Sequence, residues 1–283
     1  MSEGVLPVAG KSWEVSDEFW GRVRPLVPAA PSHARGGRSR MDDRRAFEAI
    51  VYVLRTGIQW NAMPREMGAS STVHDRFQEW VGEGFFGALH EAGLTEYDEL
   101  AGIEWEWQSA DCGTNKAPLV PKEDTGGGAV GPNPTDRGKR GTKRSLLTDG
   151  AGIPLAVAID GANRHDSKLL AATLDGIVVL RPEPEEDAQH LCLDKGYDYD
   201  FVREEVSARG YEGHIRGRGE ERRERDHERK PRRWVVERTI SWLNRSRRLL
   251  VRWEKKPENF LAFIHLACAQ LIFSRIGRMR VSG

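Results

Sequence analysis

The stretch RRWVVERTISWLNRSRR, residues 232–248, decides how the rest of this chain is interpreted. It contains no glycine or proline, and Pro231 directly precedes it, where a helix tolerates proline. At 100° per residue the predicted helix has one apolar side, formed by Val235, Val236, Ile240, Trp242, Leu243, Leu249 and Leu250. Glu237 lies at the centre of the opposite, polar side. This carboxylate is either an ion-pair partner of Arg233 and Arg238 or a functional group.

The composition indicates a folded chain of about two domains. It has 283 residues, of which 39% are hydrophobic, and this fraction excludes a disordered protein. The formal net charge is zero, but the charges are segregated. Residues 215–256 contain 16 Lys and Arg against 7 Asp and Glu, whereas residues 82–107 contain no Lys or Arg. This pattern predicts a basic surface that faces a polyanion.

The cysteines and the N-terminus favour a cytoplasmic protein. Cys112, Cys192 and Cys268 are far apart and show no metal-ligand spacing, so neither a disulfide framework nor a structural zinc site is predicted. The first ten residues lack the pattern of a signal peptide. The apolar stretch 260–273 is interrupted by polar residues, and we expect it to be too short to span a membrane.

The first part of the chain predicts a helix-turn-helix domain at residues 17–98, after a flexible lead-in at 1–16. Ser16 can cap a short helix. The basic residues 33–40 that follow it are either a linker or a minor-groove arm. Asp42 or Asp43 caps a helix that Gly57 ends, and a very short helix follows between Pro64 and Gly68. A last helix begins after Ser70 or Ser71.

That last helix is the candidate recognition helix. Its N-terminal half carries side chains suited to base edges or phosphates, namely Thr72, His74, Asp75, Arg76 and Gln78. Val73, Phe77, Trp80 and Val81 form its predicted inner face. The alternative is a small helical bundle that binds nothing.

The second part, residues 105–283, predicts an α/β domain. A strand over residues 106–111 ends near Asp111, and a Gly- and Pro-rich mobile loop covers about 118–142. Strands 143–148 and 154–159 form a hairpin through the turn at 149–152. The remaining predicted elements are a helix at 166–174, a strand at 190–193 that ends at Asp194, a helix at 197–209, a strand at 211–216, a charged loop at 217–230 and a final helix at 257–276.

The order of these elements resembles bacterial insertion-sequence DDE transposases with an N-terminal helix-turn-helix domain and a ribonuclease H-like catalytic domain. The matching segments are GRSRMDDRRAFEAIVYVLRTGIQWNAMP (37–64), STVHDRFQEW (71–80), SADCGTNKA (109–117), DGANRHDS (160–167), LDKGYD (193–198) and WVVERTISWLNRSRRL (234–249). They cover most of the chain in the family's order, and it is the six together, more than any one of them, that carry the resemblance.

The resemblance implies an acidic triad of Asp111, Asp194 and Glu237. It implies two Mg²⁺ ions, with Mn²⁺ as a substitute, Asp111 shared between them and each of the other two acids holding one. It also implies DNA contacts by Arg233 and, after the glutamate, by Asn244, Arg245 and Arg248. The sequence departs from the family at two places: Lys230 stands where some relatives have tyrosine, and Asn244 where many have a cation.

Other acidic residues are explained locally. Asp149 lies in a turn, Asp160 and Asp166 are loop or cap residues, and Asp198 can cap a helix. His165 beside Asp166 remains an alternative catalytic candidate. Trp234 either packs under a strand or stacks on an unpaired base, and packing is the prediction.

The predicted function is therefore a transposase that binds terminal inverted repeats, cleaves at the ends of an insertion sequence and joins the 3′-OH to target DNA. Its implied partners are double-stranded transposon and target DNA and a second copy of the chain, without a membrane. Its implied location is the bacterial cytoplasm, at the nucleoid. Two alternatives stay open: an inactive transposase-derived DNA-binding protein, and a metal-dependent nuclease on the same fold.

Overall fold

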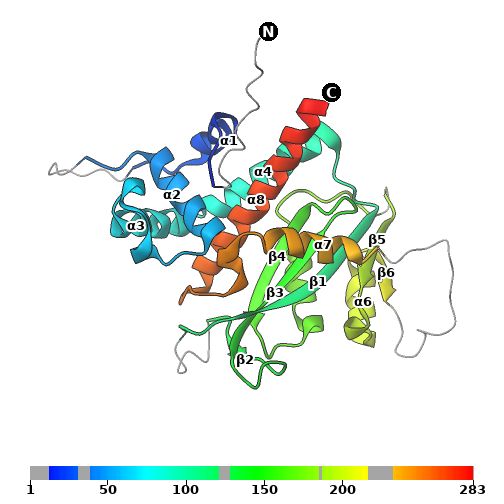
Figure 1. Ribbon diagram of the computed structural model, residues 1–283. Helices are drawn as coiled ribbons and strands as arrows, with labels where there is room; N and C mark the ends of the chain where they lie inside the picture. The colour runs from blue at the N-terminus through cyan, green and yellow to red at the C-terminus, as the bar shows by residue number, and fades with distance from the viewer. Residues whose placement is uncertain (1–12, 31–38, 121–127, 185–186, 216–231, 283) are drawn as a thin grey trace, which may run out of the picture. The chain divides into compact units, whose positions relative to one another are not determined.

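A computed structural model describes residues 13–30, 39–120, 128–184, 187–215 and 232–282 (Figure 1). Most of the predicted lead-in, most of the basic arm at 33–40 and the charged loop at 217–230 lie outside the described residues. The chain divides into two compact units, residues 1–85 and 86–283. The sequence placed the end of the first domain near residue 98, within α4 (Phe85–Ala101), which begins at this division.

The first unit consists of helices in the predicted order. They are α1 (Asp17–Val23), η1 (Arg24–Leu26), α2 (Asp43–Thr56), η2 (Trp60–Ala62), η3 (Arg65–Met67) and α3 (Ser70–Gly82). Their core is aromatic: Phe47 lies 5.8 Å from Phe19 and 6.2 Å from Phe85, and Trp80 lies 4.9 Å from Phe85, between ring centroids. Such rings bury large apolar areas and fix the packing of short helices.

The helix ends of this unit follow the sequence signals, with one exception. Asp42 caps α2 by accepting a hydrogen bond from the Arg45 amide, and Gly57 ends α2 with a φ of 71°. Gly68 ends η3 with a φ of 114°, and a Cβ there would lie 2.7 Å from Met41 Cε. The prediction that Ser70 or Ser71 caps α3 is wrong, because α3 begins at Ser70 and its N-cap, Ala69, makes no side-chain hydrogen bond.

The second unit is built on a mixed six-stranded sheet. Its strands are β1 (Trp107–Lys116), β2 (Gly131–Pro132), β3 (Arg140–Thr148), β4 (Pro154–Gly161), β5 (Gln189–Leu193) and β6 (Tyr211–Ile215). β1 lies between β3, its antiparallel partner, and β5, its parallel partner, and β6 extends the sheet beyond β5. β2 and β4 both pair with β3. This arrangement, an antiparallel meander joined to parallel strands, is that of a ribonuclease H-like domain.

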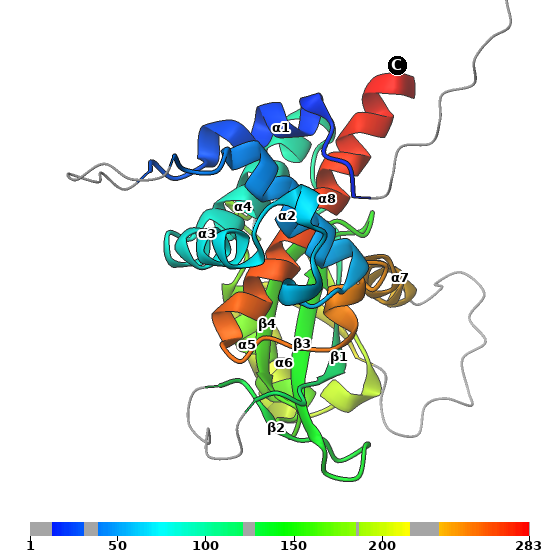
Figure 2. The ribbon, with the colours of Figure 1, turned by 60° about the vertical axis from the view of Figure 1, so that its left-hand side comes forward.

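Helices cover both faces of this sheet (Figure 2). α5 (Leu170–Asp175) follows η4 (Asp166–Lys168) and hydrogen-bonds to β3 through Thr173 and Ser145. α6 (Asp200–Ala208), which follows η5 (Lys195–Tyr197), lies on the same face. α7 (Trp234–Leu243) lies on the opposite face, where Ser109 donates to the carbonyl oxygen of Arg232. Side chains alternate along a strand, so Asp111 points to the same face as Ser109, the face of α7.

The helix predicted from residue 232 to residue 248 is shorter than expected. α7 ends at Leu243, Ser246 adopts an extended backbone with ψ 95°, and η7 (Arg247–Leu250) follows. The apolar pattern holds inside α7, where Val235, Val236 and Leu243 are buried, but Leu250 is 49% exposed. The apolar pattern did not reveal the break after Leu243, because Leu249 is buried in η7 just as a continued α7 would predict.

Several other predicted boundaries differ. β1 runs on to Lys116, so Asp111 lies within the strand and not near its end. Part of the predicted mobile loop at 118–142 is structured, because it includes β2 and the start of β3. α6 begins at Asp200 with Tyr199 as its N-cap, so Asp198 does not cap it.

The final helix, α8 (Pro257–Ser282), is longer than predicted. Its segment Pro257–Arg280 is long and apolar enough to cross a membrane, which corrects the expectation from the apolar stretch alone. However, 56% of its most apolar window is buried within the protein. The core helices of soluble proteins pass the same test of length and composition, so the helix is weak evidence for a span.

Candidate active site

The three predicted carboxylates lie on one face of the sheet. The parallel register pairs Trp107 with His190 and Ser109 with Cys192, and two further steps of this register place Asp111 opposite Asp194. Neighbouring strands are about 4.8 Å apart, so the two aspartates are adjacent. Glu237 comes to the same place from α7, which packs against β1 and β3. Strand register and helix packing, and not proximity in sequence, therefore build the cluster.

Arg233 is the cation of this cluster. Its guanidinium donates to Glu237 Oε1 from Nε at 2.9 Å and from Nη2 at 2.6 Å, and its Nη1 lies 3.9 Å from Asp194 Oδ2. Interaction with Glu237, Asp111 and Asp194 raises the Arg233 pKa, against the effect of burial. One guanidinium thus faces three carboxylates.

Asp111 is the most perturbed of the three acids. Burial raises its pKa to about 6, and the neighbouring charges of Asp194 and Glu237 act in the same direction. The hydrogen bond from the Cys112 amide at 2.8 Å and the charge of Arg233 oppose this rise only in part. A carboxylate that is destabilised in this way gains from a nearby cation.

Comparison with known proteins agrees with this geometry. A family described as transposase DDE domain matches residues 117–272, and a family described as putative transposase of the IS4/5 family matches residues 15–90. A putative transposase for insertion sequence element IS402 from Burkholderia cepacia is 37% identical over 152 residues, which is 53% of this chain and 71% of that protein. The chain belongs to the DDE transposase family. It is thus a DNA transposase and an enzyme.

The transposase is also similar to proteins of two other kinds. An IS402 uncharacterized 16.2 kDa protein from Burkholderia cepacia is 31% identical over 36% of this transposase and 73% of that protein. A Mos1 mariner paired end complex with Mn covers 86% of this chain and 82% of that chain, with 14% identity and a TM-score of 0.27. A pre-cleavage Mos1 transpososome covers 91% and 85%, with 11% identity and the same TM-score. TM-scores this low support no conclusion about the transposase.

The DDE-domain match includes Asp194 and Glu237 but begins after Asp111. The position of Asp111 therefore depends on the geometry alone. Other acids of the transposase have local partners, as expected. Buried Asp149 accepts hydrogen bonds from the Ile153 and Glu104 amides, and Asp160 accepts one from Gly161.

Two further acids and the alternative catalytic candidate, His165, also have local contacts. Asp166 pairs with Lys143 at 2.5 Å, and Asp198 pairs with Arg203 at 2.6 Å. His165, the alternative catalytic candidate, caps η4 by accepting a hydrogen bond from the Ser167 amide. These contacts give all three a structural role.

Three of the four predicted DNA-binding residues around α7 have partners within the protein. Arg248 is 3% exposed and is bound by Glu254 at 2.7 and 2.6 Å, so it is buried and not presented on the surface as the predicted contact with phosphate requires. Asn244 is half-buried and accepts a hydrogen bond from Arg144 at 3.0 Å. Arg245 is exposed, and Arg233 is occupied by the acidic cluster.

Trp234 does not pack under a strand, contrary to the prediction. It is 51% exposed, and the guanidinium of Arg238 lies 4.6 Å from its ring. Arg238 was expected to pair with Glu237, but it donates to the carbonyl oxygen of Ala151 at 2.7 Å. The indole ring is thus an accessible aromatic surface one turn before Glu237.

The candidate recognition helix α3 presents most of its predicted side chains. Thr72 is exposed, and His74 and Gln78 are half-buried. Arg76 is not exposed as predicted: it is 4% exposed, pairs with Asp43, donates to the Met41 carbonyl oxygen at 3.1 Å and lies 3.7 Å from Glu79. Burial lowers its pKa, and its pairing with Asp43 joins α3 to α2.

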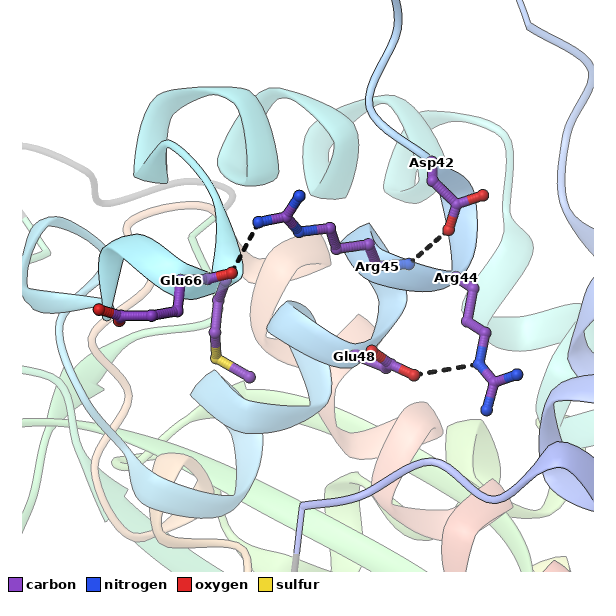
Figure 3. A pocket seen from close by; sticks show the side chains of 6 residues that line it. Asp42, Arg44, Arg45, Glu48 and Glu66 are labelled. Carbon is purple, nitrogen blue, oxygen red and sulfur yellow. Dashed lines mark hydrogen bonds and ion pairs between the residues drawn. The ribbon is translucent and has the colours of Figure 1, made fainter.

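A small hollow in the first unit lies beside the start of α2 (Figure 3). It is about 360 Å³ in volume and is lined by Asp42, Arg44, Arg45, Glu48, Glu66 and Met67. Arg45 donates to the Glu66 carbonyl oxygen at 2.7 Å, and Arg44 to Glu48 at 3.0 Å. Because both arginines already donate to acceptors of this unit, the hollow is not a ready phosphate site.

One role of Arg233 was not predicted from the sequence. Arg233 was expected as a DNA contact or as an ion-pair partner of Glu237, whereas the structure places its guanidinium close to Asp194 as well. The signal was present in the spacing, because residues four apart on a helix face each other and Arg233 precedes Glu237 by four. The approach to Asp194 had no such signal, because it depends on how α7 lies on the sheet.

Proposed function

We propose that this transposase binds the terminal inverted repeats of an insertion sequence, cleaves DNA at the ends of the element and joins the 3′-OH to target DNA. The observation that carries this proposal is the convergence of Asp111, Asp194 and Glu237 on one face of a ribonuclease H-like sheet, with Arg233 among them. Phosphoryl transfer needs concentrated charge at the reacting phosphate, and this face supplies it.

The cluster fits divalent cations. Within the described part of the chain its three acids outnumber its one guanidinium, and the raised pKa of Asp111 reflects burial and the neighbouring negative charge. All three ligands are carboxylate oxygens, which Mg²⁺ prefers and Mn²⁺ accepts. Asp111, Asp194 and Glu237 would together hold two such ions. When bound, such a pair activates the attacking oxygen and stabilises the leaving oxygen.

The chain's own residues position this chemistry. β1 and β5 hold two of the carboxylates on adjacent strands, and α7 holds the third. Arg233 orients Glu237 through two hydrogen bonds and places a positive charge where a phosphate enters. The exposed Arg245, just beyond α7, is suited to the DNA backbone, and Asn244 is fixed beside it by Arg144.

The N-terminal unit supplies DNA recognition in this proposal. Its helix order, α2, η2, η3 and α3, supports a helix-turn-helix, with Thr72, His74 and Gln78 as the contacts from α3. Arg76 instead holds α3 against α2 through Asp43. Since an element has two ends, we propose that two copies of the chain act together on DNA, in the bacterial cytoplasm at the nucleoid.

The decisive experiment follows both strands of a labelled duplex that carries the element's end and its flanking DNA, with a target plasmid in Mg²⁺. We expect cleavage at the end, a free 3′-OH and its joining to the plasmid, all lost in EDTA. Cleavage without joining would identify a nuclease. Selective binding of the end without cleavage would identify a DNA-binding relic.

Recognition is tested separately, in Glu237→Gln protein so that the DNA stays intact. Labelled element end competes against random duplex, and the ratio of affinities is measured. We expect Thr72→Ala and Gln78→Ala each to reduce this ratio by about 5- to 100-fold, since one base contact contributes about 1–3 kcal/mol. Glu83→Gln, an exposed change just beyond α3, is the control. Equal affinity of the unaltered protein for both duplexes would contradict the recognition role.

A further inference from the structure

A cluster of nitrogen and oxygen ligands lies on β5 and β6, outside the acidic site. Nδ1 of His190 is 3.0 Å from Nε2 of His214 and 3.2 Å from Oε2 of Glu212. The other oxygen of Glu212 is 3.8 Å from His214 Nε2. The three residues can each direct one ligand atom to a common point, since these atoms all lie within 4.8 Å of one another.

The sheet itself brings these residues together. The parallel register pairs His190 with Glu212 and Cys192 with His214, so the three side chains share one face of two adjacent strands. Trp107 of the neighbouring strand β1 stacks on His190, with centroids 4.3 Å apart and planes at 22°, and lies 5.0 Å from His214. Because paired strands and a stacked ring hold the imidazoles, their arrangement is preorganised.

No short sequence motif marks this cluster. Metal sites that are recognisable in a sequence have ligands a few residues apart, whereas His190 is separated from Glu212 and His214 by η5 and α6. Only the pairing of β5 with β6 closes that distance.

The ligand set differs from that of the acidic cluster. Two imidazole nitrogens and one carboxylate suit zinc and its neighbours in the first transition row, whereas Mg²⁺ prefers oxygen alone. Zinc bonds of about 2.0–2.1 Å place the ligand atoms of a tetrahedral site about 3.3 Å apart. Two of the three separations are already close to this value, and Glu212, whose side chain is 68% exposed, is free to turn for the third.

We propose that His190, Glu212 and His214 form a binding site for a transition-metal ion, Zn²⁺ being the best match, distinct from the oxygen-only site of Asp111, Asp194 and Glu237. The two sites share a face of the sheet. His190 precedes Asp194 by four residues on the same chain path, about 13 Å at strand rise. Three protein ligands leave a fourth position open to water or another donor.

The surroundings predict a consequence for α7. The Arg232 guanidinium lies 4.6 Å from the Trp107 ring, and the Arg232 carbonyl accepts a hydrogen bond from Ser109 immediately before α7 begins. A metal ion that fixes His190 also fixes Trp107 and, through it, Arg232. Binding therefore stabilises the sheet edge next to the helix that carries Glu237.

The test uses the full-length protein, stripped with chelator and then dialysed against Zn²⁺ with Mg²⁺ in excess to occupy the oxygen-only site. We expect one equivalent of Zn²⁺ to bind, a rise in melting temperature, and Co²⁺ to give the intense visible absorption of a tetrahedral site. His190→Ala, His214→Ala and Glu212→Gln should each weaken binding by at least about tenfold, as loss of a ligand does. His165→Ala and His74→Ala, which remove histidines outside the cluster, should not.

Two outcomes would overturn the proposal: no saturable Zn²⁺ binding by the unaltered protein, or equal binding by it and all three cluster variants. Glu212→Gln is exposed and should fold even where a histidine variant does not, so the comparison survives a misfolded variant. Quenching of tryptophan emission by Cu²⁺ gives a second measurement. It should diminish in Trp107→Phe, and unchanged quenching in that variant would place the ion elsewhere.

Discussion

Two charged clusters on neighbouring segments differ in how their charges are balanced. At α7, Arg233 and Glu237 are 41% and 47% exposed, and the one arginine faces three carboxylates. A few residues later, the side chains of Arg248 and Glu254 are 4% and 3% exposed and form an ion pair at 2.6 Å, with Arg252 nearby. The second cluster resembles a structural ion pair, whereas in the first, among the residues that the structure describes, the carboxylates outnumber the cation and two of them are partly open to solvent. An excess of carboxylates that is open to solvent, more than the presence of charge, is what we expect of a site that binds a cation.

Arg252 shows how neutral acceptors stabilise a buried cation in the second cluster. Its guanidinium is fully buried and donates to carbonyl oxygens of Gly128, Ala129, Glu254 and Lys255 and to the Thr142 hydroxyl. Buried cations are tolerated where such bonds replace water. At the acidic cluster, by contrast, two of the three acids are accessible to solvent, so water can solvate their charges.

The largest expected effect is on catalysis and concerns the acidic cluster at α7. Asp111→Asn, Asp194→Asn and Glu237→Gln each remove one anionic ligand with little change in shape. We expect end cleavage in Mg²⁺ to fall by about three orders of magnitude or more, as happens when one member of a cooperating catalytic set is lost. Single-turnover cleavage of a labelled end measures this effect.

The control for that experiment is Asp160→Asn, which alters a carboxylate of the same sheet that pairs with Arg164. It should cleave at near the unaltered rate. Binding of the element's end should persist in all four variants. If one triad variant keeps near-normal cleavage, that residue is not a ligand.

The next effect is on stability and concerns the buried ion pair of Arg248 and Glu254. Arg248→Ala leaves Glu254 buried without its partner, which should lower the free energy of unfolding by about 3–5 kcal/mol. The double variant Arg248→Met, Glu254→Leu should recover much of this loss, because it removes both charges. Urea unfolding measures both values. If Arg248→Ala lowered the free energy of unfolding by less than about 1 kcal/mol, the pair would not be buried in solution.

The two clusters also show which parts of the site could be predicted from the sequence. Asp194 was placed correctly because a short buried strand followed by an acid is a recognisable local pattern. The position of Asp111 within β1, rather than near its end, was not predicted, because Gly113 and Asn115, residue types that are uncommon in strands, continue the strand.

The exposure of arginines was the weakest inference. Arg76 and Arg248 were taken as surface residues, as charged side chains usually are, and both are buried. Their partners, Asp43 and Glu254, belong to other elements, and periodicity within one helix does not reveal them. The end of α7 at Leu243 was hidden for a related reason, since the apolar pattern continued through η7.

A smaller effect concerns how the stability of the protein depends on pH through Asp111. The Asp111 pKa of about 6 lies above its ordinary value of 3.8, so the folded protein holds this proton more tightly than the unfolded chain. In EDTA, the contribution of Asp111 to stability should therefore fall as pH rises from about 4 to about 6, and then stay constant. Asp111→Asn removes this penalty and should be more stable at pH 7.5 by about 1–3 kcal/mol, the lower values allowing for solvent screening.

Urea unfolding at pH 4.5 and 7.5 tests this prediction, with Asp160→Asn as the matched control. Adding Mn²⁺ at pH 7.5 should stabilise the unaltered protein more than Asp111→Asn, because the cation restores the balance of charge. Equal stability of Asp111→Asn and the unaltered protein at pH 7.5 in EDTA would mean that Asp111 is not strained by its neighbours.

The smallest effect is on the salt dependence of DNA binding, and it distinguishes an exposed arginine from a buried one. Arg245 is exposed just beyond α7, so a contact with a DNA phosphate is open to it, whereas Arg248 is held by Glu254. Each phosphate contact changes the slope of log affinity against log salt by about −0.9 on duplex DNA. Arg245→Ala should therefore flatten that slope by about one unit. Arg248→Lys, which keeps the buried charge, should leave it unchanged, and filter binding at several salt concentrations in Glu237→Gln protein measures both. If Arg245→Ala has no effect on the slope while Arg248→Lys flattens it, the DNA reaches the second cluster, and charge balance alone does not distinguish a binding surface from a structural one.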